Sequence, residues 1–371
     1  SMIVLLGYQM YFVEPPEPAA PAPASETQTP DAPASAVPAP AVPAVPGSAT
    51  PAPAPAIPQT QQKKDASLIR VSTPLYNITI SEDGAAVKGF ELKKYKATND
   101  PQSPLKELVP EQLARGTFLF DLEGQSIAGL DQAVYTASGA SAETILDQGE
   151  KTIEFSWASP QGHVVKKIFT FKADSYVINC DIVIENNTAG ILNDAIVISI
   201  PGFYDEEVKA RSRFAFEGPV VYLNDEFKNV KPDDIEITEK DRKKPEKVQE
   251  KLEKSSFSGH IAWAGYTERY FMTAVMPKEE NGSAAVGSAK LSFANDIVTT
   301  RYLHKMDRLD PGKSGVVQLR LFMGPKSQKV LRNYGNNLPE IINFGGWFNI
   351  LDLIGKPLLT IMNLIYDVIP N

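Results

Sequence analysis

The sequence predicts a mainly β protein: a large antiparallel β-supersandwich with C-terminal α-helices, preceded by a disordered linker rich in proline and alanine. Three observations support this fold class. Most of the 30 prolines fall in one stretch near the N-terminus. Short runs of alternating apolar and polar residues then recur over residues 67–325, with no helical periodicity between them. The final residues change to a helical spacing of apolar side chains.

The composition excludes several classes of protein. The formal net charge is −8 and the sequence pI is about 5.2, whereas a nucleic-acid-binding protein needs a basic surface. The single cysteine, Cys180, rules out an internal disulfide and every metal motif that needs several cysteines. We therefore expect no nucleic-acid partner and no cofactor.

The first thirteen residues are strongly apolar. The run "MIVLLGYQMYFV" is shorter than the roughly 20 residues that a membrane-spanning helix needs. It also lacks the basic start and the small-residue cleavage site of a signal peptide. Two interpretations remain, the end of a truncated transmembrane helix or a short buried helix, and we expect the first for residues 1–13.

Residues 14–66 form the predicted linker, which consists mainly of proline and alanine with scattered serine and threonine. Proline fixes φ and removes a backbone donor, so such a segment favours polyproline II and does not pack into a core. At about 3.1 Å per residue it could extend to the order of 150 Å. We interpret it as a semi-rigid spacer; the alternative is a PxxP ligand for SH3-like modules.

Residues 67–325 form the predicted β-supersandwich domain. Its clearest strand is "YVINCDIVIENN", in which Tyr176, Ile178, Cys180, Ile182 and Ile184 share one apolar face. Cys180 is therefore predicted to be a core residue and not a reactive thiol. Because strand patterns follow one another without helices between them, the arrangement indicates an antiparallel sandwich and not a βαβ sheet.

One charged segment interrupts the strand patterns. Residues 231–256 carry many charges of both signs and almost no large apolar side chains. Such a segment cannot contribute to a core, so we expect a solvated loop with one helical turn around residues 246–252. A binding surface is the alternative.

The three histidines, His163, His260 and His304, are the candidates for catalysis. Supersandwich proteins include sugar epimerases, which need a histidine and a carboxylate in one groove. None of the three has a carboxylate at a spacing that supports such a pair, and scattered histidines do not form a metal site. We expect structural or solvated histidines and no enzymatic activity.

The C-terminal residues are predicted to be helical. A short helix and connector are expected over 326–343, and an amphipathic helix over 344–371. In the latter, polar residues recur every three or four positions from Asn349 to Asp367 and form one narrow stripe, with a kink at Pro357. Charges at three of these positions disfavour a spanning helix, so we expect a helix that lies in the membrane interface. The alternative is a helix that docks on the sandwich. The candidate membrane-interface residues are Trp347, Phe348, Leu351, Ile354, Leu358, Ile361, Met362 and Ile365.

Four segments together resemble the periplasmic region of the YidC family of membrane protein insertases. They are "RVSTPLYNITISEDGAAVKGFELKKYK", "WAGYTERYFMTAVMP", "LRLFMGPK" and "NFGGWFNILDLIGKPLLTIMNLIYDVIPN", and they occur in the family's order. The resemblance covers the chain outside the proline-rich spacer. The last segment is similar to the amphipathic helix that precedes the family's second transmembrane helix.

This resemblance implies an inner-membrane protein of Gram-negative bacteria whose β-supersandwich faces the periplasm. It also implies the lipid bilayer surface, nascent membrane proteins, and the Sec components SecYEG and SecDF as partners. The family's insertion groove lies in helices that this sequence does not contain, so no groove residue is carried over. Two other functions stay open: a sugar-binding or epimerase-like domain, and an envelope adaptor similar to proline-linker proteins such as TonB.

Overall fold

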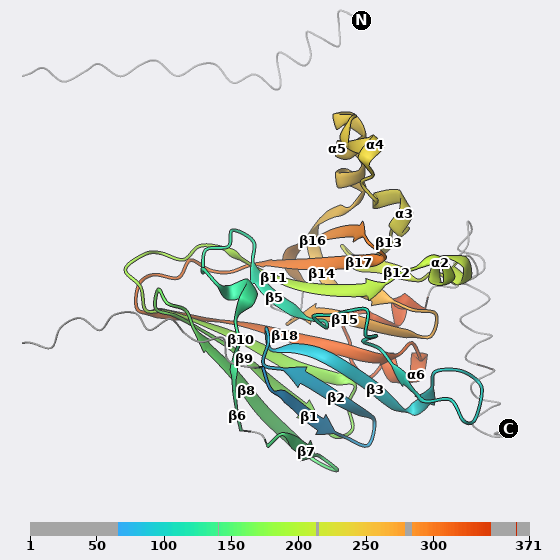
Figure 1. Ribbon diagram of the computed structural model, residues 1–371, viewed down its shortest axis with the longest axis horizontal. Helices are drawn as coiled ribbons and strands as arrows, with labels where there is room; N and C mark the ends of the chain where they lie inside the picture. Colours follow the sequence, from blue (N-terminus) through green and yellow to red (C-terminus); the bar gives the residue numbers. More distant parts are fainter. Residues whose placement is uncertain (1–65, 140, 213–214, 279–283, 343–360, 362–371) are drawn as a thin grey trace, which may run out of the picture. The chain divides into compact units, whose positions relative to one another are not determined.

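The computed structural model describes residues 66–139, 141–212, 215–278 and 284–342, together with Ile361 (Figure 1). All of these residues belong to one compact unit. The predicted helix end at 1–13, nearly all of the predicted linker at 14–66 and nearly all of the predicted helix at 344–371 lie outside the described residues. The expectations for those segments, and the domain boundaries drawn from them, stay predictions.

The described strands form two sheets, of which the smaller has five strands. Its neighbours pair in antiparallel fashion, except that β1 and β7 are parallel. In spatial order its strands are β4 (Leu105–Glu107), β3 (Ala86–Lys96), β2 (Tyr76–Ser81), β1 (Leu68–Ser72) and β7 (Glu143–Ile145).

The larger sheet has thirteen described strands, and all of its pairings are antiparallel. The prediction of a mainly β protein with large antiparallel sheets is therefore confirmed. Its main path runs β5 (Leu119–Leu122), β11 (Ala195–Phe203), β17 (Ile297–Lys305), β16 (Ala285–Ala294), β14 (Ser256–Thr267), β15 (Phe271–Pro277), β18 (Lys313–Pro325), β10 (Val177–Asn186), β9 (His163–Lys172), β8 (Glu150–Ala158) and β6 (Thr136–Ser138). Beside this path, β12 (Gly218–Leu223) pairs with β14 and with β13 (Glu226–Asn229).

Helices connect the strands at a few places. Among the described residues they are η1 (Leu130–Gln132), α2 (Glu206–Ser212), α3 (Pro232–Ile235), α4 (Glu239–Arg242), α5 (Pro245–Lys254), α6 (Gln328–Leu331) and η2 (Leu338–Ile341). Figure 1 shows α4 and α5 projecting beyond the sheets. We call α3 to α5, residues 232–254, the helical arm.

The prediction of a mostly irregular loop at 231–256 is wrong, because three short helices fill it. The expected turn at 246–252 lies inside the ten residues of α5. Two of the helices begin at a proline, which suits the first turn of a helix because its missing N–H is not needed there. At the start of α4, Thr238 and Asp241 form a capping box, which satisfies free backbone donors.

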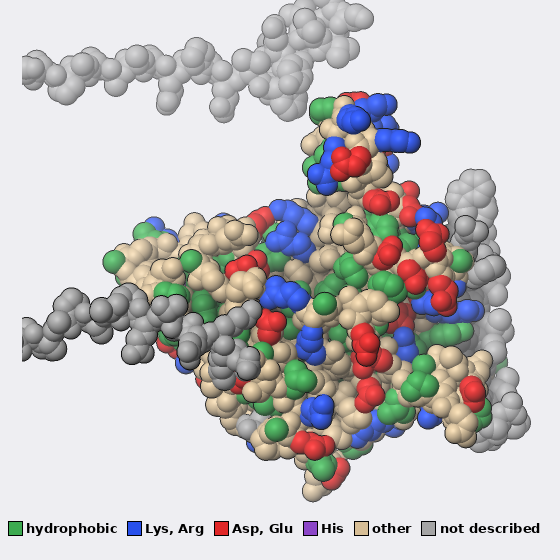
Figure 2. Space-filling model, viewed as in Figure 1, with side chains coloured by type: hydrophobic (Ala, Val, Ile, Leu, Met, Phe, Trp, Pro, Cys, Tyr) green, Lys and Arg blue, Asp and Glu red, His purple; other side chains and the backbone are tan. Residues whose placement is uncertain are grey.

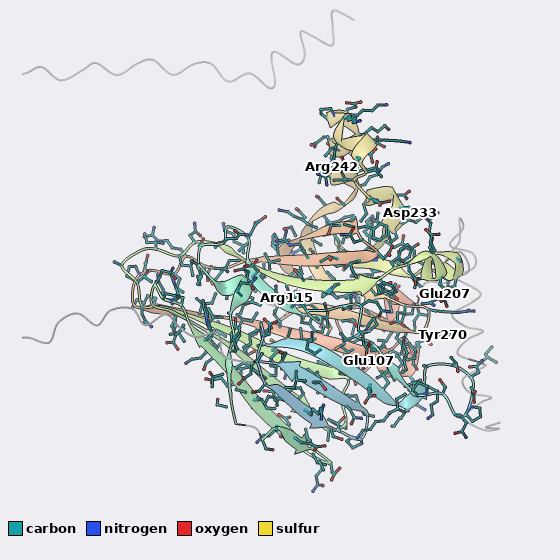
Figure 3. The ribbon with its side chains drawn as sticks, in the orientation of Figure 1. Glu107, Arg115, Glu207, Asp233, Arg242 and Tyr270 are labelled. Atoms are coloured by element: carbon teal, nitrogen blue, oxygen red, sulfur yellow. The ribbon has the colours of Figure 1, made fainter. Side chains whose placement is uncertain are left out.

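Charge is distributed unevenly along the helical arm. Basic side chains gather at its free end and acidic ones around its root and over α2 (Figure 2). Arg242 lies further from the sheets than Asp233 (Figure 3). The basic residues of α4, of the turn after it and of the first part of α5 are Lys240, Arg242, Lys243, Lys244 and Lys247. No residue of α4 or α5 is buried, so these two helices add nothing to the core.

The sandwich core follows the alternation in the strands. On β10 and β9 every second residue is buried, as a strand with one covered face requires. Cys180 is 2% exposed, and burial raises the pKa of its thiol to about 12, so the thiol stays protonated. Cys180 is thus confirmed as a core residue.

Lys167 is an unexpected member of the core, with only 1% of its side chain surface exposed. Its Nζ donates hydrogen bonds to the backbone carbonyls of Ala85, Phe118 and Gly84, at 2.7, 3.1 and 3.2 Å. All three carbonyls belong to residues with positive φ. Since Lys167 lies on β9 and Gly84 and Ala85 lie in the turn between β2 and β3, this ammonium joins the two sheets.

Candidate functional site

The structure describes one of the eight candidate membrane-interface residues. Ile361 is helical and 53% exposed, and the other seven lie outside the described residues. The prediction of a membrane-lying helix therefore stays a prediction. The described site closest to that segment in sequence is the connector over residues 326–342.

The connector packs on the sandwich through apolar side chains. α6 ends in a turn in which Gly335, Asn336 and Asn337 adopt left-handed backbone conformations, which glycine and asparagine tolerate best. This turn reverses the chain into η2. Leu331 and Leu338 become fully buried as a result, and Ile341 is nearly so. These three side chains belong to the hydrophobic core, so the connector is packed firmly against the sandwich.

Hydrogen bonds add to this packing. On β18, Arg320 donates from Nη1 to Asn336 Oδ1 at 2.7 Å and from Nη2 to the Tyr334 carbonyl at 2.6 Å. The Tyr334 hydroxyl accepts a hydrogen bond from the Tyr176 backbone N–H at 2.9 Å, and its ring lies 5.7 Å from that of Phe322. We call the contacts of Arg320, Tyr334, Asn336 and Tyr176 the Arg320 clamp. A guanidinium that binds two acceptors fixes their orientation as well as their distance.

A second feature is a cavity of about 150 Å³ between the two sheets. We call it the inter-sheet cavity. Lys106 Nζ lies 2.6 Å from Glu268 Oε2, and this ion pair joins the small sheet to the large one. Arg211 binds Glu217 through two nitrogens, at 2.9 and 3.3 Å. The lining comes from β4, residues 108–117, the end of β11, α2, Glu217, and residues 266–273 around the turn from β14 to β15.

Burial controls the electrostatics of this cavity. It raises the pKa of Glu268, although the nearby Lys106 acts in the opposite direction. Burial also raises the pKa of Glu107, whose Oε1 accepts hydrogen bonds from two backbone N–H groups. Lys326 is not part of the cavity lining but interacts electrostatically with Glu217 and Glu268, and burial lowers its pKa to about 8. The cavity therefore holds one almost fully buried carboxylate, Glu217, beside the partly exposed charges of Lys106, Glu268 and Arg211.

Two hydroxyl groups at the cavity differ in their hydrogen bonding. The Tyr266 hydroxyl donates to the Phe203 carbonyl at 2.8 Å. The Thr117 side chain contributes to the lining, but its hydroxyl oxygen is buried away from the cavity space and has no hydrogen-bond partner among the described residues. Buried hydroxyls are normally paired, so this one calls for an explanation.

Sequence reasoning did not find this cavity. Its charged residues come from widely separated positions, 106, 107, 211, 217 and 268, and each one alone reads as an ordinary surface charge. Only the pairing of the small sheet against the large one brings them together. No local motif signals such a site.

The structure does not bring the three histidines together. His163 is buried, with its Nδ1 3.5 Å from the Ser159 hydroxyl, and burial lowers its pKa. In the large sheet, His260 lies opposite Val286 of β16 and His304 lies opposite Gly287 of the same strand. Because successive residues of a strand point to opposite faces, the side chains of His260 and His304 lie on opposite faces of the sheet. None of the three lines the inter-sheet cavity. Within the described ranges there is no group of three histidine, cysteine or acidic side chains that could hold a metal.

No helix within the described residues is both long enough and apolar enough to cross a membrane.

Comparison with known proteins gives a family match. Residues 68–361 match the family described as "YidC periplasmic domain". The chain is similar to the membrane protein insertase YidC of Geotalea uraniireducens, with 30% identity over 375 residues that cover all of this chain and 63% of the relative. The corresponding protein of Pelobacter propionicus is 29% identical, and the match covers 85% of this chain and 53% of the relative. The chain thus spans between half and two thirds of the length of these curated relatives.

The solved structures that match this chain share little sequence with it. One is a galactose mutarotase-like protein from Lactobacillus casei, with a TM-score of 0.44 and 10% identity, covering 69% of this chain and 100% of that one. Another is a putative aldose 1-epimerase from Escherichia coli K12, with a TM-score of 0.39 and 10% identity, covering 70% of this chain and 99% of that one.

Proposed function

Because the chain belongs to the YidC periplasmic domain family, we propose that it is the periplasmic part of a membrane protein insertase in the inner membrane of a Gram-negative bacterium. In this proposal the domain is an interaction and positioning module and not an enzyme. It assists the insertion and folding of nascent membrane proteins, with or beside the Sec translocon. Its partners would be SecYEG, SecDF, the nascent proteins and the lipid surface.

The observation that carries the positioning role is the Arg320 clamp. Residues 344–371 are expected to lie on the membrane surface, and residues up to 342 are fixed to the sandwich by the clamp and by buried leucines. A sandwich attached in this way follows the orientation of the terminal helix. The proposal is that the clamp fixes the height and tilt of the β domain above the membrane.

A distance measurement in the full-length insertase that contains this chain tests this proposal. A spin label at position 145, where Ile145 is highly exposed at the edge of the small sheet, reports on the sandwich. Its distance to gadolinium-labelled lipid in nanodiscs should form a narrow distribution. Replacing Arg320 by alanine together with Tyr334→Phe removes the clamp's bonds, so the distribution should become broader.

Arg308→Ala is the matched control, since this arginine pairs with Asp310 at 2.9 Å on the surface and holds no connector residue. It should leave the distribution unchanged. If the double variant kept the same narrow distribution as the parent protein, the clamp would not position the domain.

A further inference from the structure

The helical arm carries charge of opposite sign at its two ends (Figure 2). α5 ends at Lys254, next to the start of β14, and it projects beyond the sheets. At roughly 1.5 Å per residue, its first residue, Pro245, lies about 14 Å further along the helix axis. Lys243 and Lys244 directly precede Pro245, and Lys240 lies on α4. We call these three lysines the basic tip.

The basic tip is not neutralised by the rest of the described chain. Asp241, the nearest acidic residue in sequence, is bound to Lys251 at 2.7 Å. None of Lys240, Lys243 and Lys244 forms an ion pair with another described residue. All three side chains are exposed. The tip thus presents positive charge to the outside of a chain whose formal net charge is −8.

Acidic side chains surround the root of the arm. Glu206 and Glu207 begin α2, and their side chains are 91% and 83% exposed. Asp233 and Asp234 lie on α3 and are exposed as well. Lys209 joins the two helices, because its Nζ lies 3.0 Å from Asp233 and 3.6 Å from Glu206. We call these four carboxylates the acidic root.

The arm holds its basic tip away from its own acidic root. Lys251 on α5 donates to the Glu236 carbonyl at 2.5 Å and to Asp241 at 2.7 Å, which fixes α4 against α5. The side chains of Lys251 and Asp241 are only 20% and 17% exposed, so water screens this pair less than a surface pair. The charges that complement the two ends must therefore come from another molecule.

A second copy of this chain carries both charges in the required order. An anionic bilayer or an acidic protein would attract the basic tip but repel the acidic root. Two arms that lie side by side in opposite directions place the tip of each against the root of the other. Such a contact is the same on both copies, so it closes into a symmetric dimer.

We propose that two copies of the chain associate through antiparallel helical arms, with the basic tip of each on the acidic root of the other. The contact consists of exposed charges, so it is weak and sensitive to salt. It uses no residue of the Arg320 clamp and is independent of the positioning function.

Sedimentation equilibrium of the intact chain in an uncharged, density-matched detergent tests the proposal. The detergent covers the apolar residues at both ends of the chain. In about 0.01 M salt the dissociation constant of the dimer should be on the order of 0.1 mM, as for a weak, transient contact. Raising the salt to about 1 M shortens the Debye length from roughly 30 Å to 3 Å and should weaken association at least tenfold.

Two charge-reversed variants test the pairing of tip and root. The tip variant carries Lys240→Glu, Lys243→Glu and Lys244→Glu. The root variant carries Glu206→Lys, Glu207→Lys and Asp234→Lys. Each variant alone should associate at least tenfold more weakly than the parent chain, because like charges then meet. An equal mixture of the two should associate again, because each reversed end meets its opposite charge on the other variant.

A matched control separates this pairing from general repulsion between acidic molecules. It reverses three exposed lysines outside the arm, Lys94→Glu, Lys96→Glu and Lys313→Glu, and so changes the net charge as much as the tip variant does. Association of the control should weaken less than threefold. Thermal unfolding shows whether each variant is folded. Should a charge reversal unfold the chain, the neutral substitutions Lys240→Gln, Lys243→Gln and Lys244→Gln replace it and should weaken association at least threefold.

Four results would overturn the proposal. They are a parent chain that stays monomeric at ten times the expected dissociation constant, a control that weakens as much as the tip variant, a root variant that associates like the parent, and a mixture of the reversed variants that fails to associate. The third would show that the basic tip meets a different acidic surface. None of these results bears on the membrane-positioning function, so the two proposals fail separately.

Discussion

At the residue scale, Lys167 shows how a buried charge is accommodated. An ammonium has three donors, and here three backbone carbonyls accept from them. The sequence contained a signal for this burial. In "HVVKKIFTFK", Lys167 shares its face with Val165, Phe169 and Phe171, whereas its neighbour Lys166 lies on the other face. Sequence reasoning passed over this position because lysine is rarely buried without a charged partner.

Replacing Lys167 by methionine should lower the free energy of unfolding by about 2–4 kcal/mol, because the three buried carbonyls lose their donor. Urea unfolding measures this directly. The matched control is Lys166→Met, since Lys166 forms a partly exposed ion pair with Glu185 at 2.7 Å and should cost no more than about 1 kcal/mol. Equal losses for the two variants would contradict a special role for Lys167.

The pH dependence of this effect has a definite sign. Burial lowers the pKa of Lys167 from 10.5 to about 8, so between pH 8 and 10.5 the unfolded chain binds more protons than the folded one. Stability contributed by this group therefore rises with pH in that window, by at most about 1.4 kcal/mol per pH unit. The stability difference between the parent chain and Lys167→Met, measured by urea unfolding from pH 7 to 10, should increase with pH. A constant or shrinking difference would refute the assignment.

At the element scale, the helical arm shows where periodicity fails as a guide. α4 and α5 have no residue in the core, so the sequence lacks the apolar stripe by which helices are usually recognised. Their signals were local: Pro232 and Pro245 at helix starts, and the capping box of Thr238 with Asp241. By contrast, the long strands were predictable, because each buries one face and alternates accordingly.

Removing α4 and α5 should leave the sandwich intact. Replacement of residues 237–253 by a short glycine-serine linker keeps Ile235 and Ser255, which are buried, and removes only side chains outside the core. The free energy of unfolding should change by less than about 1 kcal/mol, since surface substitutions away from core features have small effects. A larger loss, seen by thermal or urea unfolding, would mean that α4 and α5 pack on the sheets.

At the scale of the whole molecule, the sequence predicted an antiparallel sandwich but not its topology. The parallel pairing of β1 with β7, and the place of β5 beside β11, join segments that are distant in the chain. Alternation specifies which face of a strand is buried and says nothing about which neighbour it pairs with. The inter-sheet cavity depends on that choice of neighbours, which explains why no sequence pattern announced it. The Arg320 clamp likewise joins β18 to a turn that only the fold brings close.

The central claim is that residues 344–371 lie on the membrane and that the sandwich is positioned through them. Flotation with vesicles of phosphatidylethanolamine and phosphatidylglycerol tests it most directly, with residues 60–371 compared with residues 60–342. Both variants keep every described strand, and both omit the apolar residues 1–13, which could bind lipid themselves. The longer chain should float with the vesicles and the shorter one should remain at the bottom of the gradient. Equal flotation of the two would contradict the account.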